Sequence, residues 1–133
     1  MSERIVVDAY AWVEYLDGAT RGEKLRNLLE AGTDIYTSAV TLAEVVSKAA
    51  RTGRDHETAR AVIRGNSTIF EADEQLSYET GILHAEVRRT IKDFGLSDAY
   101  VLATARKLSA RVLTGDPHFN GLKDVIMLST THD

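Results

Sequence analysis

Short apolar runs recur along the chain, and segments with helical spacing separate them. The runs are rich in Val and Ile, and most show no alternation of polar with apolar residues. This pattern predicts strands that are buried on both faces, as in a parallel sheet. The predicted strands are RIVVD (4–8), TDIYTS (33–38), STIFEA (67–72), ARVLTGD (110–116) and DVIML (124–128).

The segments between these strands have apolar positions at helical spacing. Helices are predicted over 9–18, 20–32, 39–53, 55–66, 74–94 and 97–109. Strands that alternate with helices predict an α/β fold, in which helices flank a parallel central sheet of four to five strands. No repeat or linker divides the 133 residues, so a single domain over 1–133 is expected.

Composition narrows the classes of function. The chain has no cysteine, which excludes disulfides, zinc–thiolate sites and thiol nucleophiles. Its net charge of −4 gives no general attraction to nucleic acid or anionic lipid. There is no signal-peptide pattern at the N-terminus, and no apolar run reaches the ~20 residues that a membrane helix needs. A cytoplasmic protein without membrane contact is therefore expected.

Two acidic residues follow predicted strands directly. Asp8 comes after IVV and Asp116 comes after VLTG. Ligands of open α/β sheets bind at the carboxyl ends of the strands, so both residues are candidates for a functional site. Each also has a local explanation. Asp8 can cap the following helix, and Asp116 can cap a helix that begins at Pro117.

Two further acids lie on predicted helices. Asp98 follows Ser97, an expected N-cap, and an acid in this first turn suits the helix dipole. However, Asp98 also shares a helix face with Val101 and Leu102, which places it inward. Glu44 lies too far inside its helix to cap it, although Lys48 four residues on could pair with it at the surface. Its neighbours form an expected apolar stripe of Ala39, Leu42, Ala43, Val46, Ala49 and Ala50.

A metal site explains the four acids together, whereas each local explanation covers only one. Magnesium prefers oxygen ligands, which Asp and Glu supply. Clustered carboxylates repel one another unless a cation lies between them. We therefore expect Mg²⁺ (or Mn²⁺) at this cluster. The four histidines are scattered and are expected at surface or core positions rather than as ligands: His56, His84, His118 and His132.

Nearly the whole chain resembles the PIN-domain ribonucleases, most closely the VapC-type toxins of prokaryotic toxin–antitoxin pairs. The segments that carry the resemblance are IVVDAYAWVEYL (5–16), TSAVTLAEVV (37–46) and LSDAYVLATARKLSARVLTGDPHF (96–119). The order and spacing of four acids match the acidic quartet of that family: Asp8, Glu44, Asp98 and Asp116.

The resemblance implies a metal-dependent endoribonuclease that hydrolyses single-stranded RNA by a metal-activated water. Asp8, Glu44 and Asp98 would then ligate one Mg²⁺ or Mn²⁺, Asp116 would hold a second ion or a water, and Thr114 would orient the site. A cognate antitoxin and a homodimer are implied by resemblance alone. The chain departs from the family where many members have Ser or Thr after the first acid, because Ala9 and Tyr10 stand there.

Basic residues are needed to hold RNA near an acidic site. The stretch after Glu44 contains Lys48, Arg51 and Arg54, which are the candidate RNA contacts. A solvated helix face is the alternative explanation for these charges. Three other functions remain open: an RNA-maturation nuclease of the same fold without an antitoxin, a non-catalytic binding module, and a phosphatase with Asp8 as nucleophile. Tyr10 stands where such a phosphatase usually has a second Asp.

Overall fold

The computed structural model describes residues 3–128, and a five-stranded sheet runs through its centre. The order of the strands is β3-β2-β1-β4-β5, and all four pairings are parallel. β1 is central, and its Val6 lies opposite Tyr36 of β2 and Val112 of β4. The predicted parallel sheet is confirmed, with strands β1 (Arg4–Val7), β2 (Asp34–Ser38), β3 (Thr68–Phe70), β4 (Arg111–Thr114) and β5 (Val125–Met127).

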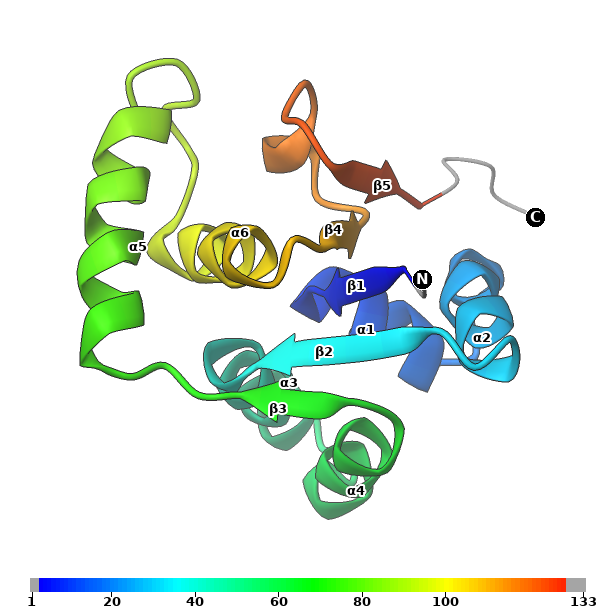
Figure 1. The fold of residues 1–133 in the computed structure, drawn as a ribbon. Coiled ribbons are helices and arrows are strands. Elements are labelled where there is room, and N and C mark those ends of the chain that lie inside the picture. Colours follow the sequence, from blue (N-terminus) through cyan, green and yellow to red (C-terminus); the bar gives the residue numbers. More distant parts are fainter. Residues whose placement is uncertain (1–2, 129–133) are drawn as a thin grey trace.

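Helices cover both faces of this sheet (Figure 1). On one face lie α5 (Glu74–Val87) and α6 (Leu96–Leu108), which pack against each other. The other face is covered by α1 (Ala9–Leu16), α2 (Glu23–Glu30), α3 (Ala39–Arg51) and α4 (His56–Asn66). Two short 3-10 helices, η1 (Thr20–Gly22) and η2 (Pro117–Phe119), complete the described chain. Within residues 3–128, no helix is long and apolar enough to span a membrane.

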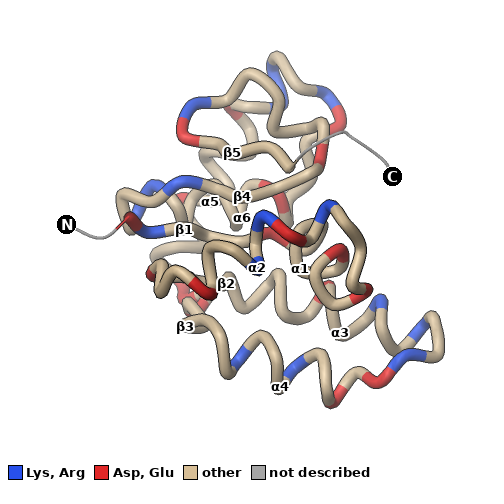
Figure 2. The backbone as a smooth tube through the Cα atoms, turned by 90° about the vertical axis from the view of Figure 1, so that its right-hand side faces the viewer, with Lys and Arg blue, Asp and Glu red and all other residues tan. Residues whose placement is uncertain are grey.

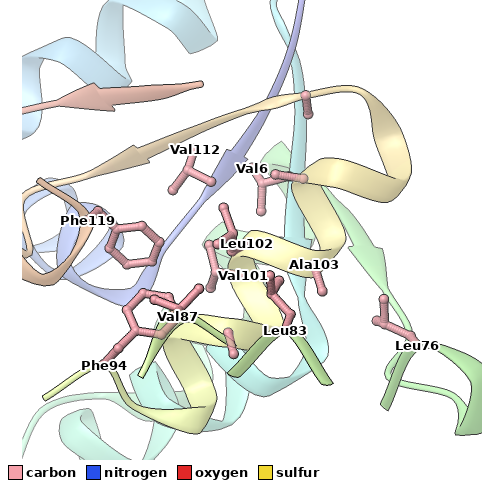
Figure 3. Packing of buried hydrophobic residues seen from close by; sticks show 13 residues of the cluster. Val6, Leu76, Leu83, Val87, Phe94, Val101, Leu102, Ala103, Val112 and Phe119 are labelled. Atoms are coloured by element: carbon pink, nitrogen blue, oxygen red, sulfur yellow. The ribbon is translucent and has the colours of Figure 1, made fainter. Parts of the chain in front are cut away.

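The alternating side chains of the strands divide the core into two clusters. Val6 and Val112 point toward α5 and α6, where Phe94 and Phe119 meet edge to face with ring centroids 5.5 Å apart (Figure 3). On the other face, the buried Trp12 of α1 donates its indole N–H to Thr37 Oγ1 at 3.1 Å. The middle strands are buried on both faces as predicted, whereas the edge strands β3 and β5 are partly exposed.

The helix predicted over 74–94 is too long. It ends at Val87, and tight turns continue the chain to Phe94, whose carbonyl lies 3.0 Å from Nε2 of His84. These turns bring Phe94 back into the core, where it is fully buried. Burial of this large ring outweighs the local preference for a longer helix, since about 25 cal/mol is gained for each Å² of apolar surface removed from water.

Two other details of the predicted helices are also wrong: the N-cap of α6 and the buried face of α3. Gly95, not Ser97, is the N-cap of α6, which begins at Leu96. In α3 the buried residues are Thr41, Val45 and Ala49, so the inward face is rotated from the predicted stripe. Ala43 and Ala50 of that stripe are exposed. The predicted stripe used the apolar residues alone, but Thr41 also belongs to the buried face.

Candidate metal centre

All four predicted acids line one cleft of about 400 Å³. Two come from the carboxyl ends of neighbouring strands, because Asp8 follows β1 and Asp116 follows β4. The other two come from helices on opposite faces of the sheet, Glu44 from α3 and Asp98 from α6. The parallel sheet therefore brings together residues that are far apart in sequence, as the position of ligand sites in α/β folds predicts.

Asp8 combines the two roles that the sequence left open. Its Oδ1 caps α1 by accepting a hydrogen bond from the Ala11 backbone N–H at 3.0 Å. Its Oδ2 accepts a short hydrogen bond from the hydroxyl of Thr114. Burial raises the pKa of Asp8 to about 7, although the bonds from Thr114 and Ala11 oppose that shift. A cap alone does not need so deep a position, so capping does not account for the whole environment of Asp8.

Thr114 connects the first and last acids. Besides donating to Asp8, its Oγ1 accepts a hydrogen bond from the Asp116 backbone N–H at 2.9 Å. The Thr114 residue is fully buried at the end of β4. These two hydrogen bonds hold the ends of β1 and β4 in fixed positions relative to each other. Thr114 therefore has the positioning role that the resemblance implied.

Asp116 and Asp98 both lie close to the ring of His118. Asp116 caps η2 through a 2.9 Å hydrogen bond from the His118 backbone N–H to Oδ1, with Pro117 at the first position of the turn. His118 Nδ1 lies 3.3 Å from that oxygen and 3.4 Å from Oδ2 of Asp98. The scattered spacing of the histidines predicts an ordinary surface or core position for His118, whereas the structure places its ring between two acids of the cleft. The sequence signal that could have identified His118 is its position two residues after Asp116.

Asp98 is also fixed by the start of its helix. Its Oδ2 accepts a hydrogen bond from the Gly95 backbone N–H at 2.9 Å. Among the described residues, the hydrogen bonds to Asp98 and Asp116 engage one oxygen of each carboxylate, and the second oxygen can take another ligand. One possible ligand atom from each of Asp98, Asp116 and His118 lies within 4.8 Å of the others.

Glu44 lies at the rim of the cleft and does not pair with Lys48. Its carboxyl group instead lies close to the Ser97 side chain at the start of α6. Although Glu44 is solvent-exposed, the protein around its carboxyl group raises the pKa, and the charges of Asp98 and Asp116 raise it further. The surface pair considered from the sequence is therefore replaced by a contact across the cleft.

The charge balance of the cleft fits a divalent cation. Burial raises the pKa of Asp98, and the charge of Asp116 adds to that shift. The charges of both residues also contribute to the raised pKa of Asp8. Carboxylates that raise one another's pKa lack a compensating charge, and a hard cation with oxygen ligands supplies it. The carboxylate oxygens of the cleft suit Mg²⁺ or Mn²⁺.

The candidate RNA contacts lie beside this cleft, at the end of α3 and in the connection to α4. Lys48 lines the cleft, and Arg51 lines the adjoining groove between α1 and α3. Arg54 instead forms an ion pair with Asp17, the C-cap of α1. Basic residues mark the end of α3, the following connection and α4 (Figure 2). Lys48 and Arg51 are therefore better placed than Arg54 for a bound phosphate.

The sequence did not reveal the wall formed by Tyr10. Its ring packs against the backbone of Gly115, between Thr114 and Asp116. A Cβ atom added at Gly115 would lie 2.5 Å and 2.6 Å from two carbons of the Tyr10 ring. The φ angle of Gly115 lies outside the positive region, so the ring contact, rather than backbone strain, requires glycine.

Gly115→Ala is therefore expected to destabilise the protein, and removal of the ring is expected to rescue it. Overpacking a tight contact costs about 1–3 kcal/mol. Thermal unfolding of Gly115→Ala, Tyr10→Ala and the double variant measures the coupling between the two positions. We expect Gly115→Ala to lower the melting temperature in the wild-type background and to have little effect beside Tyr10→Ala. Equal losses in both backgrounds would contradict the contact.

Comparisons with known proteins agree on one fold. The family model described as PIN domain matches residues 5–125. No curated protein matches the chain in sequence. Among solved structures, a toxin–antitoxin complex from Klebsiella pneumoniae is similar at 21% identity, with a TM-score of 0.71 and coverage of 92% of this chain and 96% of the other.

Two further solved structures are similar over most of both chains. VapC20 from Mycobacterium tuberculosis, described as a toxin that cleaves the sarcin–ricin loop, has 19% identity and a TM-score of 0.73, with coverage of 94% of this chain and 99% of VapC20. FitAcB from Neisseria gonorrhoeae has 25% identity and a TM-score of 0.61, with coverage of 94% of this chain and 96% of the other.

Proposed function

The chain belongs to the PIN domain family, and on that premise we propose that it is a metal-dependent endoribonuclease that acts as the toxin of a toxin–antitoxin pair. The observation that carries the proposal is the convergence of Asp8, Glu44, Asp98 and Asp116 in one cleft at the strand ends. A fold kept only for binding has no use for carboxylates that raise one another's pKa. This convergence favours catalysis over a non-catalytic binding module.

In the proposed mechanism, the four acids would bind metal or water, and Thr114 would position two of these acids. Asp8, Glu44 and Asp98 would supply oxygen ligands to one divalent ion, and Asp116 would hold a second ion or a water. When held by these acids, a divalent ion would supply an acidified water for attack on phosphorus and charge stabilisation for the leaving oxygen. Thr114 holds Asp8 and Asp116 in fixed positions relative to each other through its two hydrogen bonds. In the metal-free cleft, burial raises the pKa of Asp8 to about 7, and a bound cation would favour its ionised form.

The substrate and partners follow from the same premise. Lys48 and Arg51 would neutralise phosphates of single-stranded RNA that enters the cleft. The similar structure from Klebsiella pneumoniae is a toxin–antitoxin complex, which supports a cognate antitoxin as partner. Following the family pattern, the proposal includes a homodimer and a domain that spans 1–133.

The chemical class of the reaction is tested by the ends of the products. If water activated at the acids attacks phosphorus, cleavage should leave a 5′-phosphate and a 3′-hydroxyl, and the neighbouring 2′-hydroxyl should not be needed. The purified chain is incubated with Mn²⁺ and a single-stranded RNA that carries one 2′-deoxy sugar at the scissile position. Mass spectrometry then identifies the ends.

Continued cleavage with 5′-phosphate ends supports the proposal. Cyclic phosphate ends, or cleavage blocked by the deoxy sugar, would overturn the mechanism. A parallel reaction in EDTA provides the control, because residual cleavage there would reveal a metal-independent contaminant. A reading frame for a small protein next to this gene favours the toxin over an RNA-maturation nuclease, and its absence favours the latter.

A further inference from the structure

An aromatic ring forms part of the wall of the acidic cleft. Tyr10 is the second residue of α1, two positions after Asp8, and it lines the same cleft as the four acids. Its contact with Gly115 also places the ring beside the loop that carries Asp116. The Tyr10 residue is nevertheless 36% exposed, unlike the fully buried Trp12 of the same helix. Core packing therefore explains only part of its position.

The ring is held by two neighbours, Arg21 and Gly115. The Arg21 guanidinium lies over the ring with its carbon 5.0 Å from the centroid, and its Nη1 donates a hydrogen bond to the Tyr10 hydroxyl. Arg21 is itself paired with Glu14, with 3.6 Å between Nη1 and Oε1. Gly115 closes a further side of the ring. A ring that is fixed in this way loses little conformational freedom when a ligand binds, which favours affinity.

A fixed and partly exposed aromatic ring in the wall of the proposed catalytic cleft suits one kind of ligand group. Unpaired nucleobases stack on aromatic side chains, and every base has a π-face that allows this. We propose, as an extension of the proposed function, that Tyr10 stacks on one unpaired base next to the scissile phosphate and so selects single-stranded RNA. A base that is paired within a duplex cannot offer its face to Tyr10, so duplex RNA is excluded.

A structural role for Tyr10 is the alternative, because the ring also supports the loop before Asp116. The two roles differ in their dependence on the RNA. A support would act on every substrate alike, whereas a stacking partner needs the base itself. Replacing single bases of the RNA by abasic sites therefore separates the two roles.

The experiment scans abasic sites across the nucleotides that flank the cleavage site. Wild type, Tyr10→Phe, Tyr10→Leu and Tyr78→Leu are compared by kcat and KM with Mn²⁺. Tyr78 is the matched control, since it is a tyrosine of α5 that is 68% exposed and lies outside the cleft. Stacking is worth about 1–3 kcal/mol per base, so one abasic position should raise KM by about 5- to 150-fold in wild type.

The same abasic position should have a similar effect in Tyr10→Phe and Tyr78→Leu, and almost none in Tyr10→Leu. Equal abasic effects in wild type and Tyr10→Leu, or no sensitive position in wild type, would overturn the stacking proposal. If wild type cleaves no RNA, the proposed function fails separately. The same set of RNAs is then compared by fluorescence anisotropy in EDTA, where absence of a Tyr10-dependent abasic effect on Kd also overturns stacking.

Discussion

Replacement of Asp98 by Asn is expected to reduce RNA cleavage by roughly 10³-fold, since a lost ligand removes several kcal/mol of transition-state stabilisation. The substitution keeps an amide oxygen that can accept the 2.9 Å hydrogen bond from Gly95, so the start of α6 should survive. Stability without metal should be unchanged or higher, because burial and the charge of Asp116 already disfavour the ionised form of Asp98. Steady-state cleavage and thermal unfolding in EDTA measure the two effects.

Asp55→Asn is the matched control for this variant. Asp55 also accepts a hydrogen bond at a helix start, from the Thr58 backbone N–H at 3.0 Å, but it belongs to α4 and is not among the acids of the cleft. The Asp55→Asn variant should cleave RNA at the wild-type rate. Glu44→Gln should behave as Asp98→Asn does, since Glu44 shares the cleft. Wild-type rates for both cleft variants would show that the site assignment is wrong.

The metal-free protein is expected to lose stability as the pH rises from about 4 to 7. The pKa of Asp8 is about 7 in the folded state, against 3.8 as the ordinary value. Between these values the folded state retains a proton that the unfolded state has lost, so deprotonation opposes folding. The contribution of Asp8 is complete below the lower pKa and is lost through the higher one. It is on the order of 4 kcal/mol, and the raised pKa values of Glu44 and Asp98 act with the same sign.

Mn²⁺ should oppose this trend, because metal binding requires deprotonated carboxylates. At a hundredfold excess over the dissociation constant, the ion would add about 2.7 kcal/mol. Melting curves at pH 5.5 and pH 8, with Mn²⁺ or with EDTA, test the expectation that the metal-dependent shift is larger at pH 8. Asp8→Asn keeps an acceptor for the Ala11 N–H and should flatten the pH dependence in EDTA. An unchanged slope in that variant would assign the titration to other groups.

Local patterns in the sequence were sufficient for the α/β architecture. Short runs of Val, Ile and Leu predicted β1 and β4, and helical spacing predicted α1, α3 and α6, because backbone periodicity depends on neighbouring residues. The acids at 8 and 116 could be placed at one edge of the sheet for the same reason, since the carboxyl ends of parallel strands share an edge. The candidate acids were therefore accessible from order and spacing before any contact was known.

Tertiary structure alone decided how these groups meet. Local spacing cannot show that the His118 ring lies between Asp98 and Asp116, or that Ser97 rather than Lys48 contacts Glu44. These contacts join α3, α6 and the loop after β4, and their geometry depends on how the helices pack on opposite faces of the sheet. Likewise, Tyr10 forms part of the cleft wall because β4 lies beside β1 and Gly115, which follows β4, packs against the ring. The chain determined which groups were available, and long-range packing determined which of them share an environment.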